Sequence, residues 1–181
     1  MSTNYYNIVL YNNQKYEIDT SSIDEFHING SSVDLFGYRN SEIILKSDAE
    51  ENKFRPIYHC EYLACSIISQ RFMEVIEPFI KDNKDVEFVP VTLNSEKWGA
   101  KQYFIMHFRE CIDAINYNNS VIVNNPISYK MIKPALYNEK IKGLNLFFVN
   151  AKNGTIVSED IYNALKKEFG DSIVMDKLII V

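Results

Sequence analysis

Short apolar runs rich in β-branched and aromatic residues dominate the chain, and polar or glycine-bearing segments separate them. Runs of this kind predict β-strands. Asn12-Asn13 predicts a turn, which makes residues 6–11 and 16–19 a hairpin. Further strands are predicted at residues 42–46, 57–68, 86–93, 101–108, 120–123, 128–132, 144–149 and 155–157, with a last strand that ends at residue 181.

Two segments share one outline, and each predicts an amphipathic helix. In both, an apolar strand leads into a serine, then a helix, then another strand. The serine hydroxyl can accept a hydrogen bond from a free N–H of the first turn. Helical spacing places one apolar face on each helix. The inward residues are Phe72, Val75, Ile76 and Phe79 after Ser69, with Pro78 limiting the last turn, and Ile161, Ala164, Leu165 and Phe169 after Ser158, with Gly170 ending the helix.

The remaining pattern predicts an α+β fold. Residues 109–116 predict a short third helix with Ile112 and Ile115 inward, and Pro90 predicts a sheet edge or a bulge. We expect a mixed or antiparallel sheet with two or three packed helices on one face. Residues 1–46 form a small β-rich N-terminal region and residues 57–181 an α+β domain, and the charged loop at 47–56 joins them into one compact unit.

Composition places the chain among globular proteins of the cytoplasm. Its 181 residues are 46% hydrophobic, which is enough for a core. The N-terminal residues lack the basic and apolar regions of a secretory signal, and no apolar run approaches the ~20 residues of a membrane helix. Three cysteines cannot all pair, and none has CxxC spacing, so we expect a reducing cytoplasm and no membrane partner.

Charge is distributed unevenly. The net charge is −5, and residues 1–51 alone hold nine acids and three bases. One interpretation is a solvated acidic surface that keeps the protein soluble, and the other is a binding face for a basic partner. Nucleic acid is not expected as that partner, because phosphates need clustered positive charge. The candidate contacts, near Tyr5, Tyr6, Tyr11 and Tyr16, are Asp19, Asp24, Glu25, Asp34, Asp48, Glu50 and Glu51.

Residue types that could act in catalysis or bind a metal do not form a recognisable site. His59 and Cys65 lie about 20 Å apart along a single extended strand, which disfavours a metal site there. His107 and Cys111 would be neighbours only on a helix, whereas residues 102–108 predict a strand. Motifs for phosphate, dinucleotide, zinc and calcium binding are all missing. We therefore expect no catalytic residue, no metal and no cofactor.

Two other functions stay open. One is a small hydrolase or transferase with an unrecognised site, which a deep pocket holding His107, Glu110 or Cys111 would favour. The other is a regulatory interaction domain. Tyr129 and Tyr137 could stack on bases beside a mildly basic stretch. That stretch, better interpreted as a solvated face, contains Lys130, Lys133, Lys140, Lys142 and Lys152, opposed by Glu139.

Several segments together resemble one protein family over about residues 57–175. They are Leu63-Ala64-Cys65-Ser66-Ile67-Ile68-Ser69-Gln70-Arg71-Phe72, Val89-Pro90-Val91, Cys111-Ile112-Asp113-Ala114-Ile115-Asn116-Tyr117-Asn118-Asn119-Ser120, and Leu146-Phe147-Phe148-Val149 followed by Thr155-Ile156-Val157-Ser158-Glu159. Their order is similar to that of bacterial immunity proteins encoded beside polymorphic toxins, in the family numbered eleven. Asn116 stands where the family pattern has a second Asp, and no Arg follows Phe in the strand near residue 147.

This resemblance implies a protein that binds and neutralises a cognate toxin and has no catalysis of its own. It implies steric occlusion and charge complementarity as the means of neutralisation. An acidic surface would steer a basic toxin and speed association. Aromatic anchors would carry much of the affinity. The segments that carry the resemblance do not identify the toxin.

Overall fold

The computed structural model describes residues 4–9, 18–19, 43–47, 55–60, 65–125, 128–149 and 154–181. Within it the chain forms two compact units, and each is described by itself. The first unit contains residues 1–9 and 111–181, and the second contains residues 10–110. The predicted turn at Asn12-Asn13 and most of the predicted loop at 47–56 lie outside the described residues, so the boundary at 47–56 stays a prediction.

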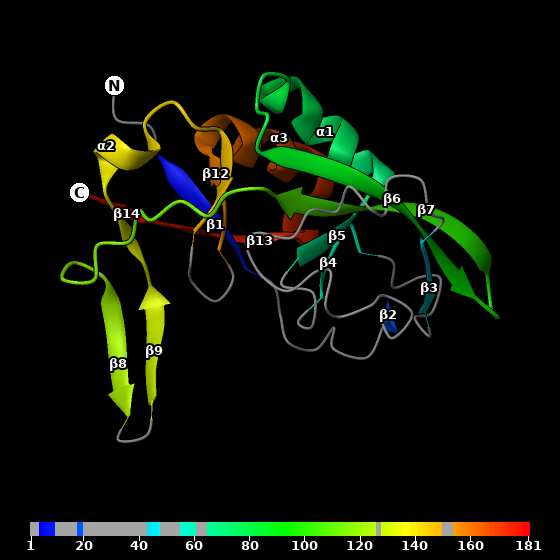
Figure 1. Cartoon of the computed structure of the whole chain (residues 1–181), viewed down its shortest axis with the longest axis horizontal. Helices are drawn as coiled ribbons and strands as arrows, with labels where there is room; N and C mark the ends of the chain where they lie inside the picture. The colour runs from blue at the N-terminus through cyan, green and yellow to red at the C-terminus, as the bar shows by residue number, and fades with distance from the viewer. Residues whose placement is uncertain are drawn as a thin grey trace. The chain divides into compact units, whose positions relative to one another are not determined.

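A mixed sheet forms the second unit. Its strand order is β2-β3-β6-β7-β5-β4, with β3 and β6 parallel and the other neighbours antiparallel. Helix α1 (Gln70–Ile80) packs against β5 and β7 (Figure 1). The strands are β2 (Ile18–Asp19), β3 (Ile43–Ser47), β4 (Ile57–Cys60), β5 (Cys65–Ser69), β6 (Val86–Ser95) and β7 (Gly99–Phe108).

Helix α1 begins where the sequence predicts. The backbone N–H of Phe72 donates to Ser69 Oγ at 3.2 Å, so the serine caps the first turn. Phe72 and Ile76 are buried, and Val75 is partly buried. Pro78 lies inside the helix on its exposed side, and the last turn continues past it to Ile80.

Two tyrosines are built into the core of the second unit. The rings of Tyr58 and Tyr103 lie 5.8 Å apart among aliphatic residues of β3, β5, β6 and β7. Both hydroxyls form hydrogen bonds with the backbone of Arg55. The Arg55 N–H donates to Tyr58 Oη at 3.1 Å, and Tyr103 Oη donates to Arg55 O at 3.4 Å. Burial, reinforced by neighbouring Tyr58, raises the pKa of Tyr103 well above its ordinary value.

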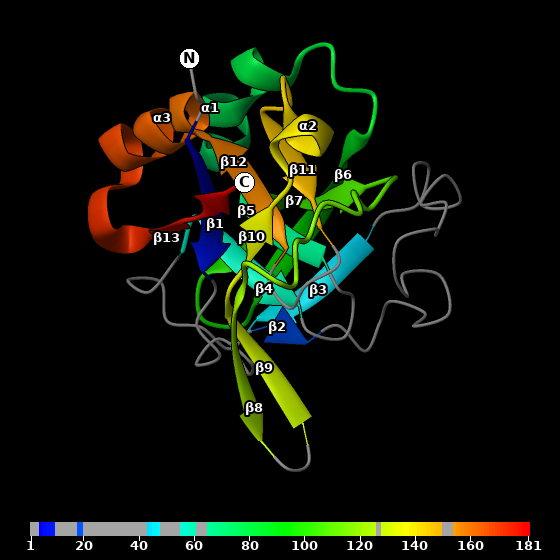
Figure 2. The same ribbon diagram turned by 90° about the vertical axis from the view of Figure 1, so that its left-hand side faces the viewer.

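The first unit is built around an antiparallel sheet with strand order β11-β12-β1-β13. Helix α3 (Glu159–Phe169) packs against β12 and β1 (Figure 2). A 3-10 turn follows α3 at Gly170–Ser172, and α2 (Asn138–Ile141) is a single short helix. The strands are β1 (Tyr5–Val9), β8 (Val121–Asn125), β9 (Ser128–Lys133), β10 (Ala135–Leu136), β11 (Leu146–Phe148), β12 (Thr155–Ser158), β13 (Val174–Lys177) and β14 (Ile179–Ile180), with β10 parallel to β14 and β8 antiparallel to β9.

Helix α3 also follows its predicted serine. Ile161 and Leu165 are buried, and Ala164 is partly buried. Gly170 ends the helix with φ of 55°, a backbone conformation that glycine adopts without strain. Ser158 Oγ is buried and makes no hydrogen bond to the described residues.

Tyr5 belongs to the core of the first unit. Its hydroxyl donates to Ile141 O at 2.9 Å, and its ring meets the Phe147 ring edge-on at 5.7 Å. Burial raises the pKa of Tyr5, and a backbone hydrogen bond at Gly143 partly opposes that shift. Tyr6 points to the other side of the strand and stacks on Tyr162 of α3 at 3.8 Å.

The fold class is confirmed: the protein is α+β and mostly β, with mixed and antiparallel sheets. One predicted hairpin is wrong. β2 pairs with β3, through Ile18 and Ser47, whereas β1 lies between β12 and β13. A short apolar strand can pair with many other strands. In this chain β1 pairs with β12 and β13, which are distant in sequence, and so it has a hydrogen-bonded neighbour along both edges.

The predicted single strand at residues 57–68 is also wrong, because the chain turns back on itself. β4 and β5 are antiparallel, and Cys60 pairs in register with Cys65. The separation of about 20 Å between His59 and Cys65, estimated for an extended strand, therefore does not apply.

Pro90 lies in β6, an interior strand, just before the described pairing of β6 with β3 starts at Val91.

The predicted helix at 109–116 is wrong as well. This segment is extended and bridges to neighbouring strands, Ile112 to Val149 and Ile115 to Leu136. Ile112 N–H donates outside the segment, to Phe148 O at 2.7 Å, and Ala114 N–H donates within it, to Ile112 O at 2.9 Å. Ala114 and Ile115 are buried, so the inward direction of Ile115 is confirmed although the helix is not.

Candidate partner-binding surface

Exposed apolar side chains gather in one stretch of the first unit. Among the described residues, Tyr117 is 54% exposed, Val121 47%, Val123 54% and Ile132 53%. We call residues 117–133 the arm. Scattered exposed aliphatic residues are ordinary, but several on one small element mark a surface for contact with another molecule.

The strands of the arm are β8 and β9, which pair only with each other among the described strands. In both views it extends away from the sheets and helices of its own unit (Figures 1 and 2). The register pairs Val121 with Lys133 and Val123 with Lys130. A bulge follows Val121, so Ile132 is the extra residue of β9.

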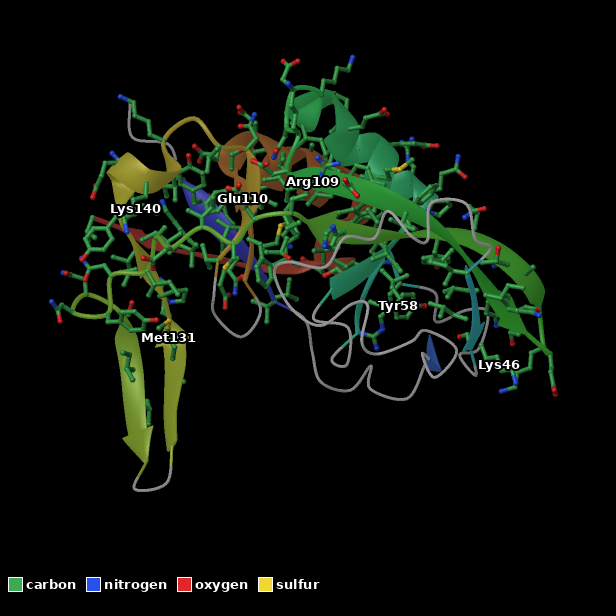
Figure 3. The ribbon with its side chains drawn as sticks, in the orientation of Figure 1. Lys46, Tyr58, Arg109, Glu110, Met131 and Lys140 are labelled. Carbon is green, nitrogen blue, oxygen red and sulfur yellow. The ribbon has the colours of Figure 1, made fainter. Side chains whose placement is uncertain are left out.

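The two faces of the arm differ. Val121 and Val123 alternate with Ile122 and therefore share the exposed face. Ile122 pairs with Met131 on the opposite face, and both are only partly exposed. Met131 packs against the core of the first unit and lies near the body end of β9 (Figure 3). The inner face thus anchors the arm and the outer face is left to solvent.

Hydrogen bonds clamp the base of the arm. Ser120 Oγ donates to Asn116 O at 2.6 Å and accepts from Ala135 N–H at 2.9 Å. Asn116 Oδ1 accepts from Asn119 N–H at 3.1 Å, and Asn116 N–H donates to Ala135 O at 2.8 Å. Ser120 therefore joins the chain entering the arm to the chain leaving it, and this fixes the direction of the hairpin.

The arm carries positive charge only. No acidic residue occurs between Asp113 and Glu139, whereas Lys130 and Lys133 both lie in β9. Val121, Val123 and Ile132 were predicted only as parts of strands, and Tyr117 only as part of the segment that carries the family resemblance. The signal available in the sequence was this long acid-free stretch.

Lys140 of the predicted lysine face and the neighbouring Tyr137 are already engaged in contacts within the first unit. Lys140 Nζ donates to Asp113 O at 2.5 Å and lies 3.6 Å from Asp113 Oδ2. The same ammonium sits over the Tyr137 ring, 5.4 Å from its centre. Tyr137 and Lys140 are thus part of the fold, while Lys142 is exposed.

The predicted acidic face falls largely outside the described residues. Asp19 lies in β2, in register with Lys46 of β3. Tyr5, named beside this face, is a core residue of the first unit. The acidic contacts stay a prediction, and the six outside the described residues are Asp24, Glu25, Asp34, Asp48, Glu50 and Glu51.

The residues that would favour an enzyme are not assembled into a described pocket. An open hollow of about 450 Å³ lies along β6, where Glu87 pairs with Arg109. His107, Glu110 and Cys111 are not among its lining residues. Burial, followed by the nearby charge of Asp113, raises the pKa of Cys111, which keeps this thiol protonated and a poor nucleophile.

The described part of the chain contains neither a cluster of metal ligands nor a helix that could cross a membrane. No group of three or more His, Cys, Asp or Glu side chains there is placed to hold a metal ion. No described helix has the length and apolar character needed to cross a membrane.

A comparison with known protein families matches residues 19–176 to the Immunity protein family (Imm11). No curated protein matches the chain. The match covers both strand–serine–helix segments, the segment after Cys111, and the arm. The chain therefore belongs to the immunity protein family Imm11.

Proposed function

We propose that this protein binds a cognate bacterial toxin of a polymorphic toxin system and neutralises it by non-catalytic occlusion. The observation that carries the proposal is the family match over residues 19–176. The arm supports it, because a preformed exposed apolar surface is what tight protein binding needs. Binding takes place in the cytoplasm, where cysteines without a pairing pattern stay reduced.

The test uses the toxin encoded by the gene next to this one. Co-expression should protect bacteria that the toxin alone kills, and the two purified proteins should form a stoichiometric complex by calorimetry. Toxin released from the complex by denaturation and refolded should have unchanged mass and full activity. Failure of both protection and binding would reject the proposal.

The same complex and released toxin also distinguish an enzyme from a protein that only occludes the toxin. A hydrolase or transferase would leave the released toxin shortened or modified, and would protect at substoichiometric amounts. Cys111→Ala provides the matched variant, because it removes the nucleophile that the sequence allows. Under occlusion, this variant should protect as the wild type does.

The acidic N-terminal residues form the second part of the proposal. We expect them to steer a basic region of the toxin, which affects association more than dissociation. Stopped-flow binding at two salt concentrations should show slower association and a flatter salt dependence for Asp19→Asn, Asp24→Asn and Glu25→Gln combined. Unchanged rates would return these acids to a role in solubility.

A further inference from the structure

We propose, on the basis of the toxin-binding function above, that the arm is the element that enters the toxin. We further infer that its site on the toxin is an apolar cleft rimmed by acidic groups. The arm would fill this cleft with Val121 and Val123 of β8, while the two lysines of β9, Lys130 and Lys133, supply the positive charge that an acidic rim complements.

Exposure of the valines is the first support. An isolated two-stranded hairpin is marginally stable in water, and this one leaves two β-branched side chains about half exposed on the same face. Within the described residues, no strand pairs with either edge of the hairpin and no other element covers this face. Apolar surface of this kind is explained by burial in a partner.

Preorganisation is the second support. Ser120 ties the two ends of the arm together, and Met131 fixes its inner face to the core. The hairpin is therefore held in one direction before any partner arrives. Binding then loses little conformational entropy, which is how a small contact surface reaches high affinity.

The positive charge of the arm indicates which kind of cleft it would fit. The arm contains lysines and no acids, although the whole chain has a net charge of −5. A cleft with acidic groups at its rim complements this arrangement. Single-stranded nucleic acid fits less well, because Val121 and Val123 on the exposed face of β8 are aliphatic, and the exposed ring of Tyr117 lies outside both strands of the arm.

The main experiment compares charged and isosteric changes on the exposed face. Val121→Asp with Val123→Asp should weaken toxin binding by about thirtyfold or more, since central apolar contacts dominate affinity. Val121→Thr with Val123→Thr keeps the β-branched shape, and should still weaken binding about tenfold. The matched control is Val181→Asp, an exposed aliphatic residue of the same unit outside the arm, which should bind as wild type.

Neutralising the lysines tests the acidic rim. Lys130→Gln with Lys133→Gln should slow association and flatten its salt dependence, while changing dissociation less. Faster association in this variant would mean that the toxin surface facing the arm is basic, and would overturn the acidic cleft. This result is independent of the valine changes.

Other outcomes separate the arm from the broader function. If wild type binds and protects while both valine variants bind equally well, the arm inference fails and the proposed function stands. If wild type neither binds nor protects, both fail. Sedimentation that shows a wild-type dimer abolished by Val123→Asp, or tight binding of the arm to single-stranded RNA, would assign the face to those occupants and overturn the inference.

Discussion

The two units contain the same helical module, assembled from different parts of the chain. In each, an antiparallel hairpin leads through a serine into a helix, and a return strand follows. A middle strand lies between the hairpin and the return strand and is antiparallel to both. In the second unit this middle strand is β7, which comes after the return strand. In the first it is β1, which precedes the module by roughly 150 residues, a strongly non-local pairing.

This difference shows what the module requires. The hairpin, serine and helix are local and follow one sequence pattern in both units. The middle strand has only to offer an apolar face of the right length, so the chain can supply it from either side. At the helix starts the two copies differ again: Ser69 Oγ caps α1, whereas Ser158 Oγ makes no cap bond and Glu159 and Asp160 stand in the first turn of α3.

Truncating the buried helix residues should give the largest loss of folding stability. It tests whether the two modules are equivalent. Ile76→Ala in α1 and Leu165→Ala in α3 should each lower the free energy of unfolding by about 2–5 kcal/mol, through lost burial and the cavity left behind. Urea titration followed by circular dichroism measures this. Glu77→Ala and Asn163→Ala, both exposed, should change it by less than about 0.5 kcal/mol. An unchanged midpoint for either core variant would break the comparison.

The second-largest effect is expected at alkaline pH, where the loss of folding stability should differ between the two cores. The pKa of Tyr103 is raised in the fold, so above pH ~10 the unfolded chain loses a proton that the folded chain keeps. Stability is complete below that pH and should fall above it by up to about 1.4 kcal/mol per pH unit for this group. Urea titrations at pH 9 and 11 should show a smaller fall for Tyr103→Phe than for wild type.

Tyr5→Phe is the counterpart in the first unit. Burial also raises the pKa of Tyr5, but a backbone hydrogen bond works against the shift. We therefore expect this variant to relieve the alkaline loss less than Tyr103→Phe does. Equal slopes for wild type and both variants would show that neither phenol contributes to the pH dependence.

The smallest expected effect is at the serines, and its sign should differ between the units. Ser69→Ala should lower the free energy of unfolding by about 1 kcal/mol, because Phe72 N–H loses its partner. Ser158→Ala should leave it unchanged or raise it slightly, because the change removes a buried hydroxyl that has no hydrogen-bond partner among the described residues. Thermal melts of the two variants beside wild type decide this. Equal losses would mean that Ser158 caps α3 in solution.

Local pattern was sufficient to predict α1 and α3 from the sequence. Ser69, Ser158 and Gly170 mark helix boundaries, and the apolar spacing identified Ile76 and Leu165 as buried. Strand partners could not be predicted in the same way, because a run such as residues 5–9 fits any neighbour with a complementary face. Residues 109–116 failed for a related reason: bridges to Leu136 and Val149, distant in sequence, outweigh a modest local helical preference.

The candidate surface was predictable only in part. The family resemblance implies a toxin partner in general, and the structure adds Val121 and Val123 as exposed apolar candidates, while the acids near Asp19 stay a prediction. Sequence alone assigned these valines to a strand and gave no sign that no neighbouring strand would cover them. Exposure is a property of the whole unit, so no short window of sequence contains it.

The position of β1 has a consequence for synthesis on the ribosome. This strand emerges among the first residues, but its partners β12 and β13 emerge roughly 150 to 170 residues later, a wait on the order of ten seconds at about 5–20 residues per second. During that interval all of residues 10–110 have been made and can begin to fold, while Tyr5 and Ile8 still lack their core. Nascent chains of the first unit therefore depend on completion of translation, and a stall shortly before β12 would leave an apolar N-terminal strand open to chaperones and to aggregation.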